Sequence, residues 1–149
     1  MIRVADLMNR HPAVVRHDAT LLDAVRLIAA SRCSDVMVLD SAGRWEGVLS
    51  EGDVLRRMLP SFDTIRDPSE DGSGVLEENA EQLGDLPVHC FMIRGAITIA
   101  PDESLLRAAA IMASMNIRRL PVVSEGRLVG TLGREDLCIG LLVAGEAAP

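Results

Sequence analysis

Aromatic side chains are nearly absent from this sequence. Among its 149 residues, aromatics make up 2%, with one tryptophan, two phenylalanines and no tyrosine. The core must therefore be built from Val, Leu, Ile, Met and Ala, which fits a chain that is 48% hydrophobic. This length and hydrophobic content allow either one substantial core or two half-domains that share one.

Lysine is absent and positive charge is scarce. All 15 basic residues are arginine, and 22 acidic residues give a formal charge of −7. Nucleic acids and anionic membrane surfaces are bound through clustered positive charge, so we expect neither kind of partner. Much of the acidic excess lies in residues 60–83, which hold seven acids and one arginine. We interpret this segment as a solvated linker rather than an acidic flap, with a short helix over Val75–Leu83.

Cysteine pairs and long apolar runs are also missing. Cys33, Cys90 and Cys138 lie far apart and form no CxxC spacing, which favours a reduced cytoplasmic protein with buried thiols. His89 stands beside Cys90, but adjacent side chains point apart and no second ligand pair follows, so no metal site is expected. No run approaches the ~18 apolar residues of a membrane span, and the N-terminus lacks the apolar segment of a signal peptide.

An internal repeat is present. Thr20-Leu21-Leu22 lies 84 residues before Ser104-Leu105-Leu106. Later in each copy the offset drops to 83, as between Gly47 and Gly130, because the first turn, Asp40–Gly43, is one residue longer. A length change confined to a turn is what a structural repeat tolerates. The sequence therefore predicts a duplicated chain.

Each copy is predicted to run β-α-β-β-α. A strand, a crossover helix and a second strand favour parallel pairing, and the tight turn at Gly43 favours an antiparallel hairpin. In copy one we expect a short helix over 2–9, strands Ala13–Val15, Val36–Leu39 and Trp45–Leu49, and helices from Thr20 and over Glu51–Met58. In copy two we expect a strand over Ala96–Ile99, strands on either side of the Gly126 turn and a last helix over Arg134–Val143. The predicted core positions of the crossover helices are Leu21, Val25 and Ile28, matched by Leu105, Ala109 and Met112.

The domain boundaries follow from the repeat. We expect repeat 1 at 1–58, the acidic linker with its short helix at 59–83, repeat 2 at 84–143 and a tail at 144–149. Neither repeat is expected to be stable alone, because a three-stranded sheet with two helices leaves one face uncovered.

These residues carry a family resemblance. An Asp-Leu-Met start, an Asp-x-Thr/Ser-Leu helix entry, a Leu-Pro-Val-Val strand, a Gly-Arg-Leu-Val-Gly hairpin and a Ser-x-x-Asp helix entry are similar to the cystathionine β-synthase (CBS) domain. Roughly residues 1–143 resemble a free-standing CBS pair, an α/β (α+β) fold in which two β-α-β-β-α repeats pack about a pseudo-twofold axis. Copy two is the closer match, since Met37 stands in copy one where Pro121 stands in copy two.

The resemblance implies a regulatory or sensor module. Such modules bind AMP, ADP, ATP or a related adenosyl ligand such as S-adenosylmethionine in clefts between the repeats, and no cofactor is required. In the family, the acid of the Ser/Thr-x-x-Asp motif holds the ribose hydroxyls, and the residues before the Leu-Pro-Val strand face the phosphates. By position, the ribose residues are Asp53 and Asp136, with Ser50 and Gly133 at the hydroxyl position. The phosphate residues are Arg118 and Arg119. The adenine edge would be held by the backbone of the short strands at Val14, Ile97 and Thr98.

Each of these assignments has a structural alternative. Ser50 and Asp53 also form an ordinary capping box, worth ~1 kcal/mol to a helix without any ligand. The two arginines could be solvated charges at a helix end, and at most one is expected to enter the cleft because successive residues point apart. Copy one has Asp35 where copy two has Arg119, and an acid repels phosphate. We therefore predict one high-affinity nucleotide site, dependent on Arg118 or Arg119 and on Asp136.

No catalytic set emerges from the sequence. His11, His17 and His89 lie in no nucleophile motif, and there is no P-loop, GxGxxG or HExxH, so an enzyme is not expected. A sensor implies a regulated protein partner or a change in its own assembly. The alternative is a structural dimerisation or interaction module with empty clefts. In either case a homodimer would use the apolar faces of Glu51–Leu59 and Arg134–Val143.

Overall fold

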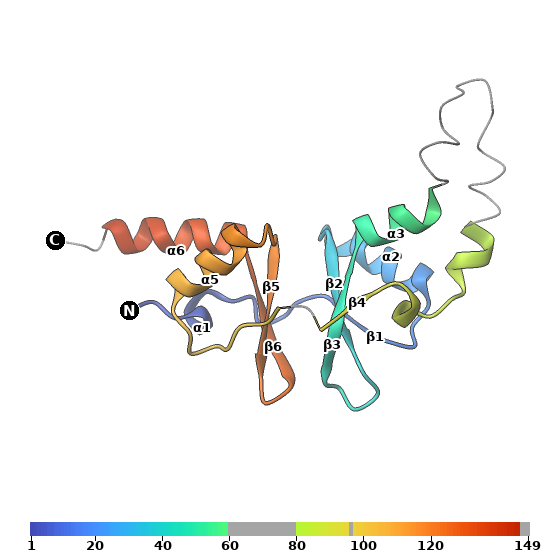
Figure 1. Cartoon of the computed structure of the whole chain (residues 1–149), viewed down its shortest axis with the longest axis horizontal. Helices are drawn as coiled ribbons and strands as arrows, with labels where there is room; N and C mark the ends of the chain where they lie inside the picture. The colour runs from blue at the N-terminus through green and yellow to red at the C-terminus, as the bar shows by residue number, and fades with distance from the viewer. Residues whose placement is uncertain (60–79, 96, 147–149) are drawn as a thin grey trace, which may run out of the picture. The chain divides into compact units, whose positions relative to one another are not determined.

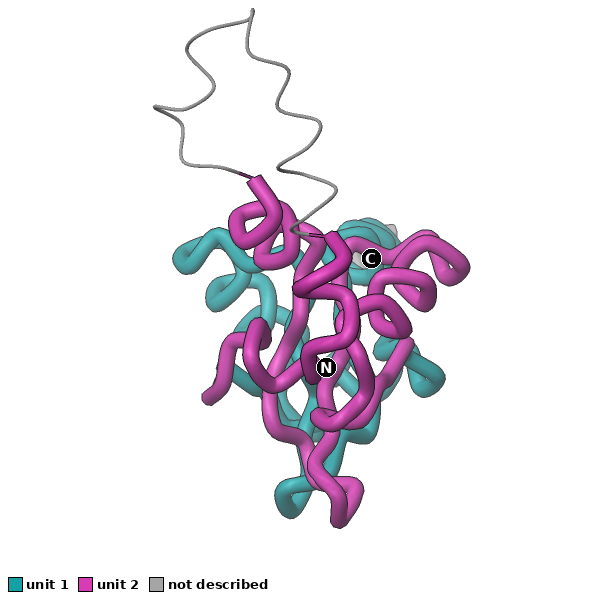
Figure 2. Tube along the Cα trace, turned by 90° about the vertical axis from the view of Figure 1, so that its right-hand side faces the viewer, with its two compact units in different colours: residues 1–12, 96–149 teal, residues 13–95 magenta. Residues whose placement is uncertain are grey.

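The computed structural model describes residues 1–59, 80–95 and 97–146 (Figure 1). The chain forms two compact units, drawn in different colours in Figure 2. Unit 1 comprises Met1–Pro12 and Ala96–Pro149, and unit 2 comprises Ala13–Gly95. The units differ from the two sequence repeats, because the first 12 residues belong with copy two and the first residues of copy two belong with copy one.

Unit 2 contains a four-stranded sheet with the order β1-β2-β3-β4. These strands are β1 (Val14–Arg16), β2 (Asp35–Leu39), β3 (Trp45–Ser50) and β4 (Ile93–Arg94). β1 pairs parallel to β2 and β2 pairs antiparallel to β3, which confirms both predicted pairings. β4 pairs antiparallel to β3 and has no counterpart in the prediction, because a two-residue strand is too short to show an alternating pattern.

Two helices of unit 2, α2 and α3, begin where the sequence predicts. Thr20 caps α2 (Leu21–Ser31), because its Oγ1 accepts a hydrogen bond from the Asp23 N–H at 3.1 Å. Helix α3 spans Glu51–Met58, as predicted, and a 3₁₀ turn, η2, spans Val88–Cys90. Of the predicted helix Val75–Leu83, residues 80–83 are helical, the helix continues to residue 84, and the earlier part lies outside the described residues.

The buried faces of the crossover helices are rotated slightly from the prediction. In α2 the buried residues are Leu21, Ala24 and Ile28, whereas Val25 is only partly buried. The corresponding helix of unit 1 behaves in the same way, with Ala108 buried and Ala109 partly buried. Alanine has the smallest side chain of the apolar set, so it lies where the helix approaches its core most closely. The repetition of this detail supports the duplication.

Unit 1 contains a two-stranded antiparallel sheet of β5 (Arg119–Ser124) and β6 (Arg127–Gly133). Its helices are α1 (Val4–Leu7), α5 (Leu105–Ser114) and α6 (Arg134–Glu146). The strand predicted over Ala96–Ile99 is reduced, among the described residues, to one parallel bridge between Ile99 and Val122.

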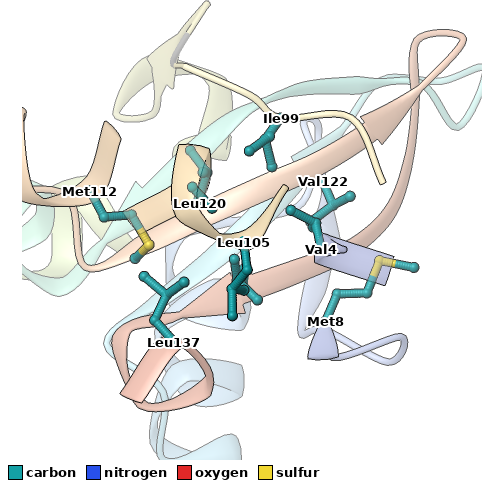
Figure 3. Close-up of a cluster of buried hydrophobic side chains, with 10 residues drawn as sticks. Val4, Met8, Ile99, Leu105, Met112, Leu120, Val122 and Leu137 are labelled. Atoms are coloured by element: carbon teal, nitrogen blue, oxygen red, sulfur yellow. The ribbon is translucent and has the colours of Figure 1, made fainter. Parts of the chain in front are cut away.

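The core of unit 1 recruits the N-terminal segment (Figure 3). Val4 is fully buried among Leu105, Leu120 and Leu137 and their neighbours. The backbone joins the same unit, since the Val4 N–H donates to the Glu103 carbonyl at 3.0 Å and the Leu105 N–H donates to the Ile2 carbonyl at 3.0 Å. The short helix α1 is therefore held by tertiary packing rather than by its own four-residue length.

The thiols differ from the prediction. All three cysteines are free, but Cys90 and Cys138 are exposed and Cys33 is half-buried, so the expectation of buried thiols is wrong. Of the helices in the described ranges, none has the length and apolar content needed to cross a membrane.

Candidate functional site

A carboxylate lies at the junction between β6 and α6 in unit 1. Asp136 is half-buried in the first turn of α6, and its Oδ2 accepts a hydrogen bond from the Gly133 N–H at 2.8 Å. Among the hydrogen bonds of the described residues, this carboxylate accepts the one from Gly133. Gly133 has no side chain to complete a capping box, so Asp136 keeps acceptor capacity that a ligand hydroxyl can use.

Arg119 lies across the sheet from this junction. It begins β5 and pairs in register with Gly133. Its side chain is 18% exposed, and its Nη2 lies 3.5 Å from Oε1 of Glu135, a residue whose own side chain is 63% exposed. Arg118 is exposed, so the two arginines occupy different environments, as expected for successive residues of an extended segment. The structure thus brings Arg119, Gly133 and Asp136 together.

Arg134 is a further arginine of this region that sequence reasoning did not single out. Its Nε donates to the Ile117 carbonyl at 3.1 Å, and its Nη2 donates to Asn116 Oδ1 at 2.9 Å. Asn116 has a positive φ of 53°, in the turn that follows α5. Arg134 therefore fastens the end of α5 to the start of α6, which is a structural use of its charge. Its position directly after a strand was the available sequence signal.

The carboxylate at the corresponding junction of unit 2 already accepts three hydrogen bonds. Asp53 is buried, with 8% of its surface exposed. Its Oδ2 accepts hydrogen bonds from the Ser50 N–H at 3.0 Å and the Ser50 hydroxyl at 2.8 Å, while its Oδ1 accepts from Arg56 Nη2 at 2.6 Å. The Asp53 N–H donates in return to Ser50 Oγ at 3.1 Å. The capping-box interpretation of Ser50 and Asp53 therefore describes their contacts in this structure.

The two junctions share one backbone arrangement, compared unit by unit. In unit 2, Asp35 pairs with Ser50 and the Glu51 N–H donates to the Ser34 carbonyl at 2.9 Å. In unit 1, Arg119 pairs with Gly133 and the Arg134 N–H donates to the Arg118 carbonyl at 3.3 Å. The charges are opposite, because acidic Asp35 and Glu51 take the places of Arg119 and Arg134. The same frame is thus basic in unit 1 and acidic in unit 2.

The residues expected to meet an adenine edge are divided between the units. Val14 begins β1 in unit 2 and is 40% exposed. In unit 1, Ile97 packs against the core and Thr98 is exposed. Both precede Ile99, whose N–H donates to the Pro121 carbonyl at 3.0 Å and whose carbonyl accepts from the Val123 N–H at 2.9 Å. The pairing of Ile99 with β5 positions Ile97 and Thr98 relative to that strand.

Metal ligation has no support within the described ranges. There, no three His, Cys, Asp or Glu side chains lie close enough together to hold a metal ion. His89 and Cys90 do meet, with Sγ 3.8 Å from Nδ1, but they form a pair without further ligands of the kind that a metal site needs.

Two mixed α/β units with matching strand-to-helix junctions define a tandem-repeat protein. The family model described as the CBS domain matches residues 4–60 and 83–142, which covers both copies. The chain belongs to the CBS domain family and carries two copies of the domain.

Relatives match over nearly the full chain. MJ1426 of Methanocaldococcus jannaschii is 33% identical over 93% of this chain and 90% of its own length. The crystal structure of CBSX2 in complex with AMP has a TM-score of 0.76 and 22% identity, covering 97% of this chain and 99% of CBSX2, a CBS-pair protein of Arabidopsis thaliana. The CBS domain pair of MJ0100, solved with 5′-methylthioadenosine and S-adenosyl-L-methionine, has a TM-score of 0.69 and 20% identity over 97% of this chain and 98% of that one. At these identities the structural likeness establishes the fold.

Other relatives are much longer than the segment that matches. The chain spans 40% of MJ1225 of Methanocaldococcus jannaschii and 24% of homoserine O-acetyltransferase of Methanohalophilus mahii. Only about a quarter of the acetyltransferase matches this chain, and its name describes the whole of that longer protein.

Proposed function

We propose that this chain is a regulatory module that binds an adenosyl ligand, AMP, ADP, ATP or S-adenosylmethionine, through the β6–α6 junction of unit 1. The observation that carries the proposal is Asp136, a half-buried carboxylate held by one backbone N–H and lying on the same junction as Arg119. The structures of CBSX2 with AMP and of the MJ0100 CBS domain pair with 5′-methylthioadenosine and S-adenosyl-L-methionine support this class of ligand.

The chemistry of this junction suits a nucleoside. A vicinal diol is best met by a carboxylate that accepts from both hydroxyls, which is the role proposed for Asp136. A phosphate is best met by guanidinium groups and by the positive end of a helix, which Arg118, Arg119 and the start of α6 supply. Ile97 offers an apolar contact and Thr98 a backbone edge for the purine.

The proposal assigns the high-affinity nucleotide site to unit 1 alone. In unit 2, both oxygens of Asp53 already accept hydrogen bonds, so a ribose would compete with Ser50 and Arg56 for this carboxylate. Asp35 replaces Arg119 there, and a carboxylate beside a phosphate is repulsive. Val14, Ser50 and Asp53 are therefore proposed to contribute less binding energy than Asp136, Arg118 and Arg119.

A thermal-shift screen against AMP, ADP, ATP and S-adenosylmethionine tests this proposal. A ligand at 100 times its Kd stabilises the folded state by about 2.7 kcal/mol, which corresponds to a rise of several degrees in Tm. We expect Asp136→Ala to abolish the ligand-induced rise and Asp53→Ala to retain it. Because Asp53→Ala also removes a helix cap, the comparison uses the ligand-induced change in Tm and not the Tm itself. A chain that no ligand stabilises, or an unchanged rise in Asp136→Ala, would overturn the proposal.

A dimerisation module is the second candidate, and exposed apolar side chains favour it. Leu55 and Leu59 at α3 are 54% and 47% exposed, and Ile139 and Leu142 on α6 are 59% and 71% exposed. A groove of about 580 Å³ runs between α2 and α3 of unit 2 and is lined mainly by apolar residues, including Val25, Ile28, Val54, Leu55 and Met58. Exposed apolar patches of this kind mark association surfaces. The same screen separates the two functions, because a scaffold without a ligand gains no stability from any of the four compounds.

A further inference from the structure

A second carboxylate of the unit 1 junction, Glu135, is not explained by ribose binding. Its side chain folds back over the junction, so that a Cβ added to Gly133 would overlap Oε1, Oε2 and Cδ of Glu135. From this position Oε1 lies 3.5 Å from Arg119 Nη2. Glu135 thus places a negative charge beside the arginine that is proposed to meet the ligand phosphate.

The pairing has the geometry of a replaceable counter-ion. Glu135 is 63% exposed and its separation from Arg119 is longer than that of a charge-assisted hydrogen bond. Because the Glu135 carboxylate is exposed to water, its attraction to the half-buried Arg119 is partly screened. Arg134 is partly engaged elsewhere, because its Nε and Nη2 donate to the segment that follows α5. A ligand phosphate that approaches Arg119 Nη2 therefore competes with the Glu135 carboxylate.

Unit 2 shows that this arrangement is particular to one copy. Ser50 of unit 2 corresponds to Gly133 of unit 1, and Gly52 corresponds to Glu135. Unit 2 therefore has a side chain at the first of these two positions and none at the second, whereas unit 1 has the reverse. The absence of a Cβ at Gly133 leaves room for Glu135 in unit 1. The φ of Gly133 is not positive, so its backbone conformation is open to residues with a Cβ. What a Cβ would collide with is the side chain of Glu135.

We infer that Glu135 is a specificity-determining residue of the unit 1 site, where its carboxylate competes with the phosphates of the ligand for Arg119. This inference rests on the proposed function. The cost of displacing Glu135 falls on every ligand that carries a phosphate near Arg119, whereas an uncharged nucleoside leaves the ion pair in place. Glu135 thereby lowers the affinity for AMP and ATP but not the affinity for adenosine, so that these affinities differ less.

Calorimetric titration of Glu135→Gln with adenosine, AMP and ATP tests the inference. We expect the variant to bind ATP about tenfold more tightly than wild type, which corresponds to about 1.4 kcal/mol, and to bind adenosine with unchanged affinity. Glu103→Gln is the matched control, since Glu103 forms an exposed ion pair of 3.6 Å with Arg107 in the same unit. Gly133→Ala should act in the same direction as Glu135→Gln, because its Cβ expels the carboxylate without removing the charge. An unchanged ratio of ATP to adenosine affinity in Glu135→Gln would overturn the inference.

Tripolyphosphate separates failure of this inference from failure of the proposed function, because it presents phosphates without an adenosyl group. If no adenosyl compound binds any variant, the proposed function fails. In that event, tighter tripolyphosphate binding by Glu135→Gln than by wild type still supports the competition for Arg119, and equal or absent tripolyphosphate binding in both contradicts it. If wild type and Glu135→Gln bind the nucleotides equally, the proposed function stands and the inference fails.

Discussion

At the scale of single residues, Asp40 organises the longer turn of copy one. Its Oδ1 accepts hydrogen bonds from the N–H groups of Ala42 and Arg44, both at 2.9 Å, and Gly43 completes the turn with a φ of 78°. The Arg44 N–H contributes most to lowering the pKa of the Asp40 carboxyl below its ordinary value of 3.8, and the Ala42 N–H adds to it. Partial burial opposes this shift without reversing it. The extra residue of this turn is thus accommodated by one side chain.

The lowered pKa makes the contribution of Asp40 dependent on pH. A carboxyl whose pKa is lower in the folded state stabilises the fold above its unfolded pKa, and this stabilisation is lost as the pH falls through the folded pKa. We expect Asp40→Ala to lower the urea midpoint at pH 7 and to lower it less at a pH below 3. Asp18→Ala is the control, since Asp18 bonds only to the exposed Arg16 side chain among the contacts described for it. An equal loss of stability in Asp40→Ala at both pH values would contradict this account.

The candidate site shows what residue patterns can and cannot predict. Position within the repeat was enough to place Asp53 and Asp136 on equivalent junctions, and the structure confirms that equivalence in their hydrogen bonds to Ser50 and Gly133. It was not enough to predict that Arg56 also donates to Asp53, because that depends on the rotamer of a long side chain one turn away. The position of Glu135 over Gly133 was equally hidden, since it depends on the absence of a side chain at a neighbouring residue.

At the scale of elements, the packing of β4 against β3 depends on one glycine. A Cβ at Gly47 would collide with the backbone carbonyl oxygen of Ile93 and lie 3.1 Å from its carbon. The pair is also linked by an ion pair between Arg94 and Glu46, which anchors the last residues of unit 2 to its sheet. Because the obstacle is backbone, it cannot be relieved by a change of rotamer.

We expect Gly47→Ala to destabilise the protein by about 1–3 kcal/mol, because β4 has to move away from β3. Gly52→Ala is the matched control, since the atoms nearest to its Cβ would lie 3.6–3.9 Å away and belong to side chains. That substitution should be neutral or stabilise α3 by up to about 1 kcal/mol. Chemical denaturation of both variants measures the difference, and equal stabilities would contradict the proposed collision.

Helices and strands could be predicted from the sequence where neighbouring residues alone determine them. The bounds of α3 and the pairing of β1, β2 and β3 followed from caps, turns and apolar runs, and are confirmed. The buried face of α2 was misplaced by one residue, because Val25 is more hydrophobic than Ala24 but the smaller side chain fits the closest approach. β4 could not be predicted, since its two residues acquire strand geometry only by pairing with β3.

At the scale of the whole molecule, the duplication was evident in the sequence and the family match confirms it over both copies. The composition of the compact units was not predictable in the same way. The apolar residues of α1 indicate that the segment is buried, but they do not specify against which copy. The backbone hydrogen bonds of Val4 and Leu105 place it in unit 1.

The central claim is that the basic junction of unit 1 is the single high-affinity site for an adenine nucleotide. Isothermal titration calorimetry with ATP on the wild type, Arg119→Ala and Asp136→Ala tests it most directly. The account predicts one nucleotide bound per chain and affinity reduced about 10- to 100-fold in each variant, as expected when a charge-assisted hydrogen bond is lost. Two equivalent sites per chain, with affinities that neither substitution changes, would contradict it.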